Sequence, residues 1–79
     1  MIDSKELNRI IRDSGMKREH IAKILGITSN SLKNKIEGRT DFKSKEILVL
    51  KKILNLSIGQ IGQIFFGEEL ELNSNFMGA

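Results

Sequence analysis

Residues 15–42 read GMKREHIAKILGITSNSLKNKIEGRTDF. Two short segments of this stretch carry apolar residues at the spacing of an α-helix, and a glycine follows each of them. Glycine readily adopts the left-handed backbone conformation that ends a helix and turns the chain. The pattern therefore predicts helices over about residues 18–25 and 29–37, which end at Gly26 and Gly38.

The two predicted helices differ in how much apolar surface they offer. The first is expected to bury Ile21, Ile24 and Leu25 on one face. The second has only Leu32 and Ile36, four residues apart, to hold it against a core. Most of the surface of the second helix is therefore expected to be polar and exposed.

Three more helices are predicted outside this stretch, over about residues 4–14, 44–54 and 58–66. Side chains that can cap helix N-termini stand at Asp3 or Ser4, at Thr28 and at Ser57. The apolar residues of these helices predict one core, to which Phe42 anchors the preceding loop; its expected members are Leu7, Ile10, Ile11, Ile47, Leu50, Ile53, Leu54, Ile58, Ile61 and Phe65.

The length of 79 residues fits a single domain. We expect residues 1–67 to form a compact, all-α five-helix bundle and residues 68–79 to form a C-terminal tail. The absence of cysteine excludes disulfides and thiolate metal sites. Nothing resembles a signal peptide, and the apolar runs are too short to span a bilayer, so a cytoplasmic protein without a membrane partner is expected.

The positive charge is concentrated in the middle of the chain. The formal net charge is +3, but residues 17–45 contain eight basic and three acidic side chains, a net of +5. A basic centre of this kind points to a polyanionic partner. The alternative is an ordinary solvated surface, which charge alone does not distinguish.

Residues 29–35 have side chains suited to the major groove of DNA. Ser29, Asn30, Lys33 and Asn34 can donate to or accept from base edges, and Lys35 can reach a phosphate. The alternative here is a capped polar helix on the surface with no ligand.

The order and spacing of residues 15–42 resemble the helix-turn-helix core of the Cro and phage-repressor (XRE-like) family. That family has a glycine, a helix with a central alanine, Leu-Gly, a β-branched residue, Ser or Thr, a polar helix, then glycine with a basic residue. Residues 42–66 are similar to the last two helices of short phage and prophage members, so the resemblance covers about residues 4–67. The matching core positions are Gly15, Ala22, Leu25, Gly26, Ile27, Thr28, Gly38 and Arg39.

The resemblance implies a lambda-repressor-like helix-turn-helix fold and sequence-specific binding of double-stranded DNA by a small transcriptional repressor that acts as a homodimer. Ser29, Asn30 and Asn34 would face bases, with Lys33 as a further reader. The residues expected on phosphates are Lys17, Arg18, Thr28, Lys35, Arg39 and Lys43. Two positions depart from the family: Lys17 replaces a capping residue, and Lys35 replaces an apolar residue.

A homodimer interface is expected at Leu48, Val49 and Phe66, which widen the apolar surface beyond what one small core requires. The alternative is that the tail covers them with Leu70, Leu72 or Phe76.

No enzymatic activity is expected, and no cofactor, metal or small-molecule substrate. His20 is the only histidine and has no partner at metal-binding spacing. Two other functions remain open: a protein-interaction adaptor built on the same fold, and an antitoxin that represses its own operon.

Overall fold

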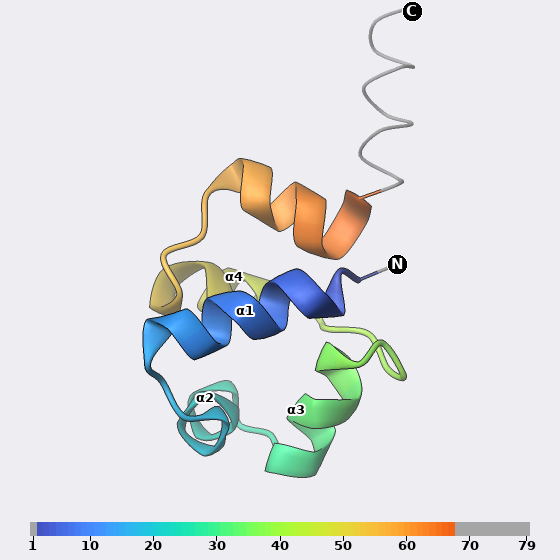
Figure 1. The fold of residues 1–79 in the computed structure, drawn as a ribbon. Helices are drawn as coiled ribbons and strands as arrows, with labels where there is room; N and C mark the ends of the chain where they lie inside the picture. The colour runs from blue at the N-terminus through green and yellow to red at the C-terminus, as the bar shows by residue number, and fades with distance from the viewer. Residues whose placement is uncertain (1, 68–79) are drawn as a thin grey trace, which may run out of the picture.

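The computed structural model of the protein describes residues 2–67. This range contains five helices and no strand. Four of them are labelled in Figure 1. Their bounds are Ser4–Ser14 for α1, Arg18–Leu25 for α2, Ser29–Ile36 for α3 and Ser44–Ile53 for α4. The fifth helix begins at residue 58 and continues through residue 67. The predicted all-α class and the predicted order of helices are confirmed, whereas the predicted tail at residues 68–79 lies outside the described residues.

The helices start and stop where local chemistry predicts. Side-chain oxygens cap three N-termini: Asp3 accepts from the Glu6 N–H at 3.1 Å, Thr28 from Ser31 at 3.0 Å and Ser57 from Gln60 at 3.0 Å. Gly15 and Gly26 follow α1 and α2 with φ angles of +76° and +74°, and Gly38 has a φ of +83°. These are left-handed conformations, in which glycine meets no Cβ clash.

Each of the five helices contributes to one apolar core. The largest fully buried side chains are Leu7, Ile21, Leu32, Ile36, Leu50 and Ile64. Helix α1 crosses the middle of the bundle, with α2 and α3 on one side of it and the fifth helix on the other (Figure 1). The core therefore holds α2 and α3 against a common support while leaving their far sides exposed.

The expected core differs from the observed one in four residues. Ile24 and Ile58 are 42% and 75% exposed, although both were expected inside, whereas Leu56 and Ile64 are buried and were not expected there. The fifth helix instead turns Ile61, Ile64 and Phe65 inward, which are three and four residues apart and so share a face. Periodicity alone leaves the rotation of such a short helix open to this error.

Candidate nucleic-acid interface

The most exposed surface of α3 is polar. Its buried stripe consists of Leu32, Lys35 and Ile36. At about 3.6 residues per turn, the middle of the opposite side falls at Asn30, flanked by Lys33 and Asn34. Asn30 and Lys33 are exposed, whereas Asn34 is half-buried. Among the residues expected to read bases, Asn30 therefore projects most directly away from the core.

A tight turn positions α3 relative to α2. The Ile27 N–H donates to the Ala22 carbonyl at 3.0 Å, which closes the turn through Gly26. The exposed Thr28 then caps α3 through its hydroxyl oxygen. Because that oxygen accepts the Ser31 N–H, the first turn of α3 is ordered by its own sequence and presents Ser29 and Asn30 at its start.

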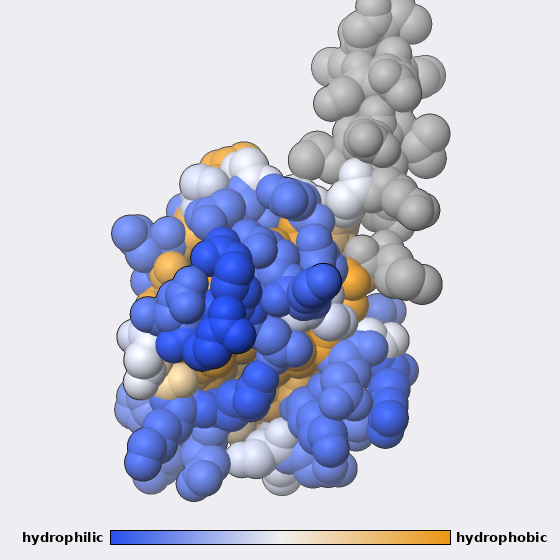
Figure 2. All heavy atoms as spheres, in the orientation of Figure 1, coloured by the Kyte–Doolittle hydropathy of each residue, from blue (hydrophilic) through white to orange (hydrophobic). Residues whose placement is uncertain are grey.

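Arg18, Ser29 and Lys33 line one hollow of about 290 Å³ between α1, α2 and α3. Figure 2 shows this side of the molecule as mainly hydrophilic, with hydrophobic atoms visible between the polar ones. The guanidinium of Arg18 donates to the side-chain oxygen of Asn8 in α1, which holds the cation at the edge of the hollow. Glu19 and Glu37 also line it, so the hollow carries both signs of charge.

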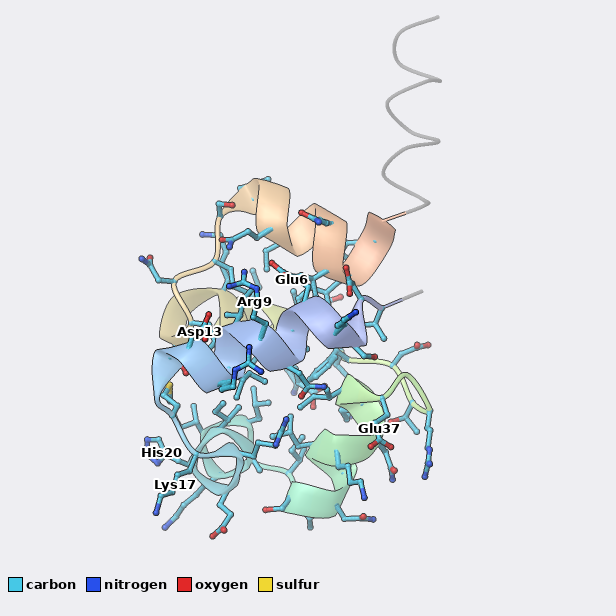
Figure 3. The ribbon with its side chains drawn as sticks, in the orientation of Figure 1. Glu6, Arg9, Asp13, Lys17, His20 and Glu37 are labelled. Atoms are coloured by element: carbon cyan, nitrogen blue, oxygen red, sulfur yellow. The ribbon has the colours of Figure 1, made fainter. Side chains whose placement is uncertain are left out.

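Two more side chains at the N-terminal end of α2 project into solvent. Lys17 and His20 point away from the bundle in Figure 3, and both are exposed. Lys17 precedes α2 without making a side-chain capping bond, as its departure from the family pattern led us to expect. Its ammonium group is thus not used to stabilise the helix end.

The basic side chain Arg9 of α1 is neutralised by its own helix. Its guanidinium lies 2.7 Å from Glu6 and 3.0 Å from Asp13 (Figure 3). The hydrogen bond from Arg9 lowers the pKa of the Glu6 carboxyl below its ordinary value. This exposed network leaves α1 with little net positive charge to offer a polyanion.

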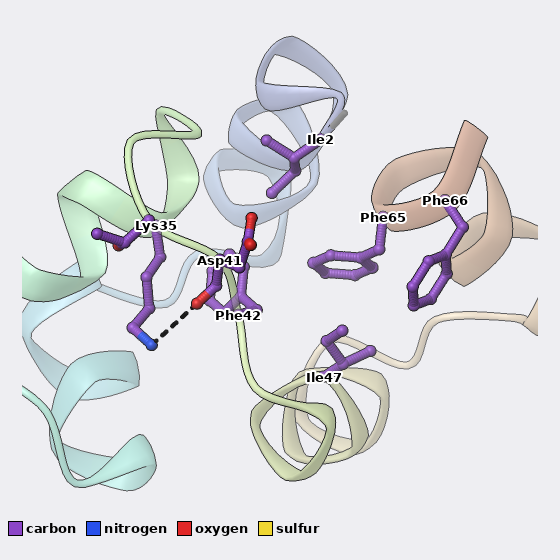
Figure 4. A pocket seen from close by; sticks show the side chains of 8 residues that line it. Ile2, Lys35, Asp41, Phe42, Ile47, Phe65 and Phe66 are labelled. Carbon is purple, nitrogen blue, oxygen red and sulfur yellow. Dashed lines mark hydrogen bonds between the residues drawn. The ribbon is translucent and has the colours of Figure 1, made fainter. Parts of the chain in front are cut away.

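Lys35 does not lie where a phosphate contact requires it, so that expectation is wrong. The residue is 8% exposed, and its Nζ lies 2.9 Å from Glu46 Oε1 in α4 and 3.2 Å from the Asp41 carbonyl oxygen. The hydrogen bond to Asp41 is drawn in Figure 4. Lys35 occupies the inner face of α3, where its charge is paired and its ammonium group is withdrawn from the surface.

Burial raises the pKa of the Glu46 carboxyl, but the hydrogen bonds from the Lys35 ammonium and the Lys43 backbone outweigh it, so the pKa lies below its ordinary value. The Lys43 N–H donates to Glu46 Oε1 at 2.8 Å. The same carboxylate oxygen therefore joins α3 to the first turn of α4 as an ionised group.

The loop between α3 and α4 carries the other two predicted phosphate contacts. Arg39 and Lys43 are exposed, as expected for residues that meet a ligand. The Nε of Arg39 lies 3.5 Å from Glu37 Oε1, so part of its charge is balanced within the chain. The Lys43 side chain lines a second hollow, together with Lys45 at the start of α4.

The three residues expected at a dimer interface do not share one hollow. Val49 lines the second hollow beside the exposed Ile24 of α2. Phe66 lines a different hollow, with Ile2 and Phe42 (Figure 4). Leu48 is 60% exposed and Phe66 41% exposed, whereas Val49 is half-buried.

Sequence reasoning missed two residues that organise this region, Asn8 and Glu46. Glu46 is the third residue of α4, where a glutamate commonly accepts the N–H of the residue before the helix, and that position was the available signal. Asn8 gave no signal, because its partner Arg18 belongs to another helix, ten residues away.

Within residues 2–67, no group of three side chains suited to a metal ion occurs, and no helix combines the length and apolarity needed to cross a bilayer. Comparison with protein-family models, with curated proteins and with solved structures finds no match to this chain.

Proposed function

We propose that α2 and α3 form a helix-turn-helix of the lambda-repressor-like type, which binds double-stranded DNA with α3 in the major groove. The observation that carries the proposal is the exposed polar side of α3, with Asn30 opposite the buried stripe. Asparagine, serine and lysine offer the donors and acceptors that base edges match.

Exposed cations before and after α3 in the chain support the same proposal. Arg18 lies at the start of α2, and Arg39 and Lys43 lie in the loop that follows α3. Phosphate contacts on the two flanks of a recognition helix set its register on the duplex but carry no sequence information. Specificity would then come from Ser29, Asn30, Lys33 and Asn34, and affinity from the flanking cations.

The chain would act as a small phage- or prophage-type repressor and bind as a homodimer through the surface around Leu48 and Val49. The proposed action is non-covalent and requires no cofactor. A selection of bound duplexes from random oligonucleotides tests it: enrichment of a palindrome supports a DNA-binding dimer, and no binding at low salt contradicts the proposal. An antitoxin that represses its own operon would use the same chemistry.

A protein-interaction adaptor is the second candidate. The observation that favours it is the exposed apolar side chain of Ile24, which lies beside Val49 in the second hollow, where the adaptor would contact a protein partner. An adaptor would show no DNA binding even at low salt, so the same selection separates the two candidates.

A further inference from the structure

The Lys35–Glu46 ion pair is the most enclosed charged contact between two helices in residues 2–67. The two side chains are 9% and 7% exposed, and Nζ and Oε1 are 2.9 Å apart. Among the described residues, no buried side-chain nitrogen or oxygen lacks a hydrogen-bond partner. Each of the two charged groups therefore has hydrogen-bond partners within the chain, and both lie largely out of solvent.

The pair joins three parts of the proposed DNA-binding surface. Lys35 belongs to α3, and its ammonium group also donates to the Asp41 carbonyl of the loop at 3.2 Å. Glu46 belongs to α4, and its Oε1 accepts the Lys43 N–H at 2.8 Å. Two side chains thus tie the helix that carries Asn30 to the loop segment that carries Lys43.

Aromatic packing closes the pair from one side. The Phe42 ring centroid lies 6.0 Å from Lys35 Nζ and 5.5 Å from the Phe65 ring, which it meets edge-on at 86°. In Figure 4, Phe65 points toward Phe42, and both side chains line the hollow that Lys35 borders. The loop is therefore fixed between α3 and the fifth helix.

Stability alone does not account for a pair of this kind. Desolvation of two charges cancels much of their attraction, and apolar residues of similar volume commonly serve as well or better. A hydrogen-bonded pair differs from an apolar contact in being directional. Leu32 and Ile36 are the apolar members of the buried stripe of α3, and the pair adds a directional attachment at the edge of that stripe.

We propose that Lys35 and Glu46 are positioning residues, whose ion pair sets the rotation of α3 and the path of the loop so that Asn30 and Lys43 meet the same DNA. This inference rests on the proposed function. Neither residue contacts DNA; each acts through the residues that do.

The test replaces the pair by apolar residues in the full chain, as Lys35→Met with Glu46→Leu. The urea midpoint is expected to fall only slightly: apolar packing replaces the ion pair, but the Lys43 N–H loses its acceptor, at a cost of about 1 kcal/mol. Affinity for the selected duplex should fall roughly 10- to 100-fold, the scale of one lost base contact, with a much smaller change on scrambled DNA. The matched control, Glu6→Gln with Arg9→Gln, also removes one acid and one base but on α1, and should bind like the wild type.

A second variant, Glu46→Gln, keeps an oxygen that can accept from Lys35 and Lys43. It should discriminate between the two duplexes nearly as well as the wild type, because the hydrogen-bond geometry is retained. If Glu46→Gln lost as much affinity for the selected duplex as the double variant, the inference would be overturned, since the hydrogen-bond geometry at Glu46 would not be the cause. Loss of the fold in the double variant would also overturn it, because the pair would then serve stability.

The wild type distinguishes failure of this inference from failure of the proposed function. If the wild type binds no duplex at low salt, the proposed function fails and the inference fails with it. If the wild type discriminates and the double variant discriminates equally well, only the inference fails.

Discussion

At the scale of single residues, the structure assigns different tasks to side chains that look alike in the sequence. Lys33 and Lys35 are two residues apart, but Lys33 is exposed whereas Lys35 is buried against Glu46. Asn30 and Asn34 lie on one side of α3, but only Asn30 is exposed. Under the proposed function, Asn30 becomes the first candidate for reading a base.

Replacing Asn30 by alanine should weaken binding to the selected duplex roughly 10- to 100-fold, because a bidentate contact to a base is worth about 1–3 kcal/mol. Scrambled DNA should be bound almost as before, since asparagine carries no charge. The measurement is a titration of both duplexes at several salt concentrations.

Arg39→Ala is the contrasting variant. It should weaken binding to both duplexes alike. The slope of log affinity against log salt concentration should fall by about one, as expected for a lost phosphate contact. If Asn30→Ala behaved in this same way, Asn30 would position the protein and Lys33 would become the better candidate reader.

The ionised Glu46 predicts a pH-dependent stability. Because its pKa in the folded chain lies below the ordinary 4.5, it stabilises the fold above that pH, and the contribution is lost as the pH falls through the folded pKa. Glu46→Gln should therefore lower the free energy of unfolding by about 1 kcal/mol at pH 7 and by less near pH 3, since the carboxyl becomes protonated as the pH falls. Urea unfolding at both pH values measures this difference.

Glu6, whose side chain is 28% exposed, provides the comparison. Its pKa is also lowered, by the hydrogen bond from Arg9, but water screens that pair. Glu6→Gln should show a smaller difference between the two pH values. A Glu46→Gln effect that did not depend on pH would mean that the carboxyl is not the ionised partner of Lys35.

At the scale of helices and turns, two glycines with similar backbones have different surroundings. Gly26 and Gly38 both have positive φ angles, of +74° and +83°. A Cβ at Gly26 would meet nothing within 4 Å, whereas one at Gly38 would lie 3.2 Å from the Ile2 side chain. The α2–α3 turn is therefore open, and the end of α3 packs against the N-terminal segment.

Gly26→Ala should lower the free energy of unfolding by about 1–2 kcal/mol, the strain of a left-handed backbone alone. Gly38→Ala should cost more, because Ile2 must also move. Urea unfolding of the two variants gives the comparison, and Gly26→Asn should recover part of the loss, since asparagine tolerates this conformation. Equal losses of unfolding free energy at both glycines would show that the Ile2 side chain moves aside without a measurable cost.

At the scale of the whole molecule, the proposed function requires that exposed cations surround α3. Lys35 is excluded by burial, which leaves Lys17, Arg18, Lys33, Arg39 and Lys43 exposed. A dimer that uses three of these on each half-site would neutralise about six phosphates, so affinity should fall roughly 10³-fold between about 50 and 200 mM salt. A flat salt response in the titration would remove the electrostatic basis of the proposal.

The proposed dimer predicts that a charge on its surface will separate the protomers. Leu48 is 60% exposed, so Leu48→Glu should leave the fold intact but bury a carboxylate against the partner. Sedimentation should show a monomer, and operator binding should fall sharply, because paired recognition helices about 34 Å apart are lost.

Ile58→Glu is the matched control for the dimer, since Ile58 is 75% exposed and lies outside the proposed interface. It should sediment and bind like the wild type. A Leu48→Glu protein that still dimerises would place the interface elsewhere, with the surface around Phe66 as the next candidate.

Local sequence alone was enough to predict the helices of this protein. Thr28 and Ser57 cap the helices that follow them, and Gly26 and Gly38 adopt the left-handed conformations that the sequence predicts. Capping, left-handed turns and helical periodicity each depend on residues a few positions apart. For that reason the helix bounds and the polar character of α3 could be predicted without tertiary information.

Only the tertiary structure decided how each helix is rotated and which charges remain exposed. The burial of Lys35 depends on Glu46, eleven residues further on in another helix, and Arg18 depends on Asn8 in α1. Ile24 and Ile58 fit the helical spacing of their neighbours but face outward, because other residues of the same helices, such as Ile21 and Ile64, fill the core. Such contacts arise between segments that no local pattern connects, so the periodicity of one helix cannot fix them.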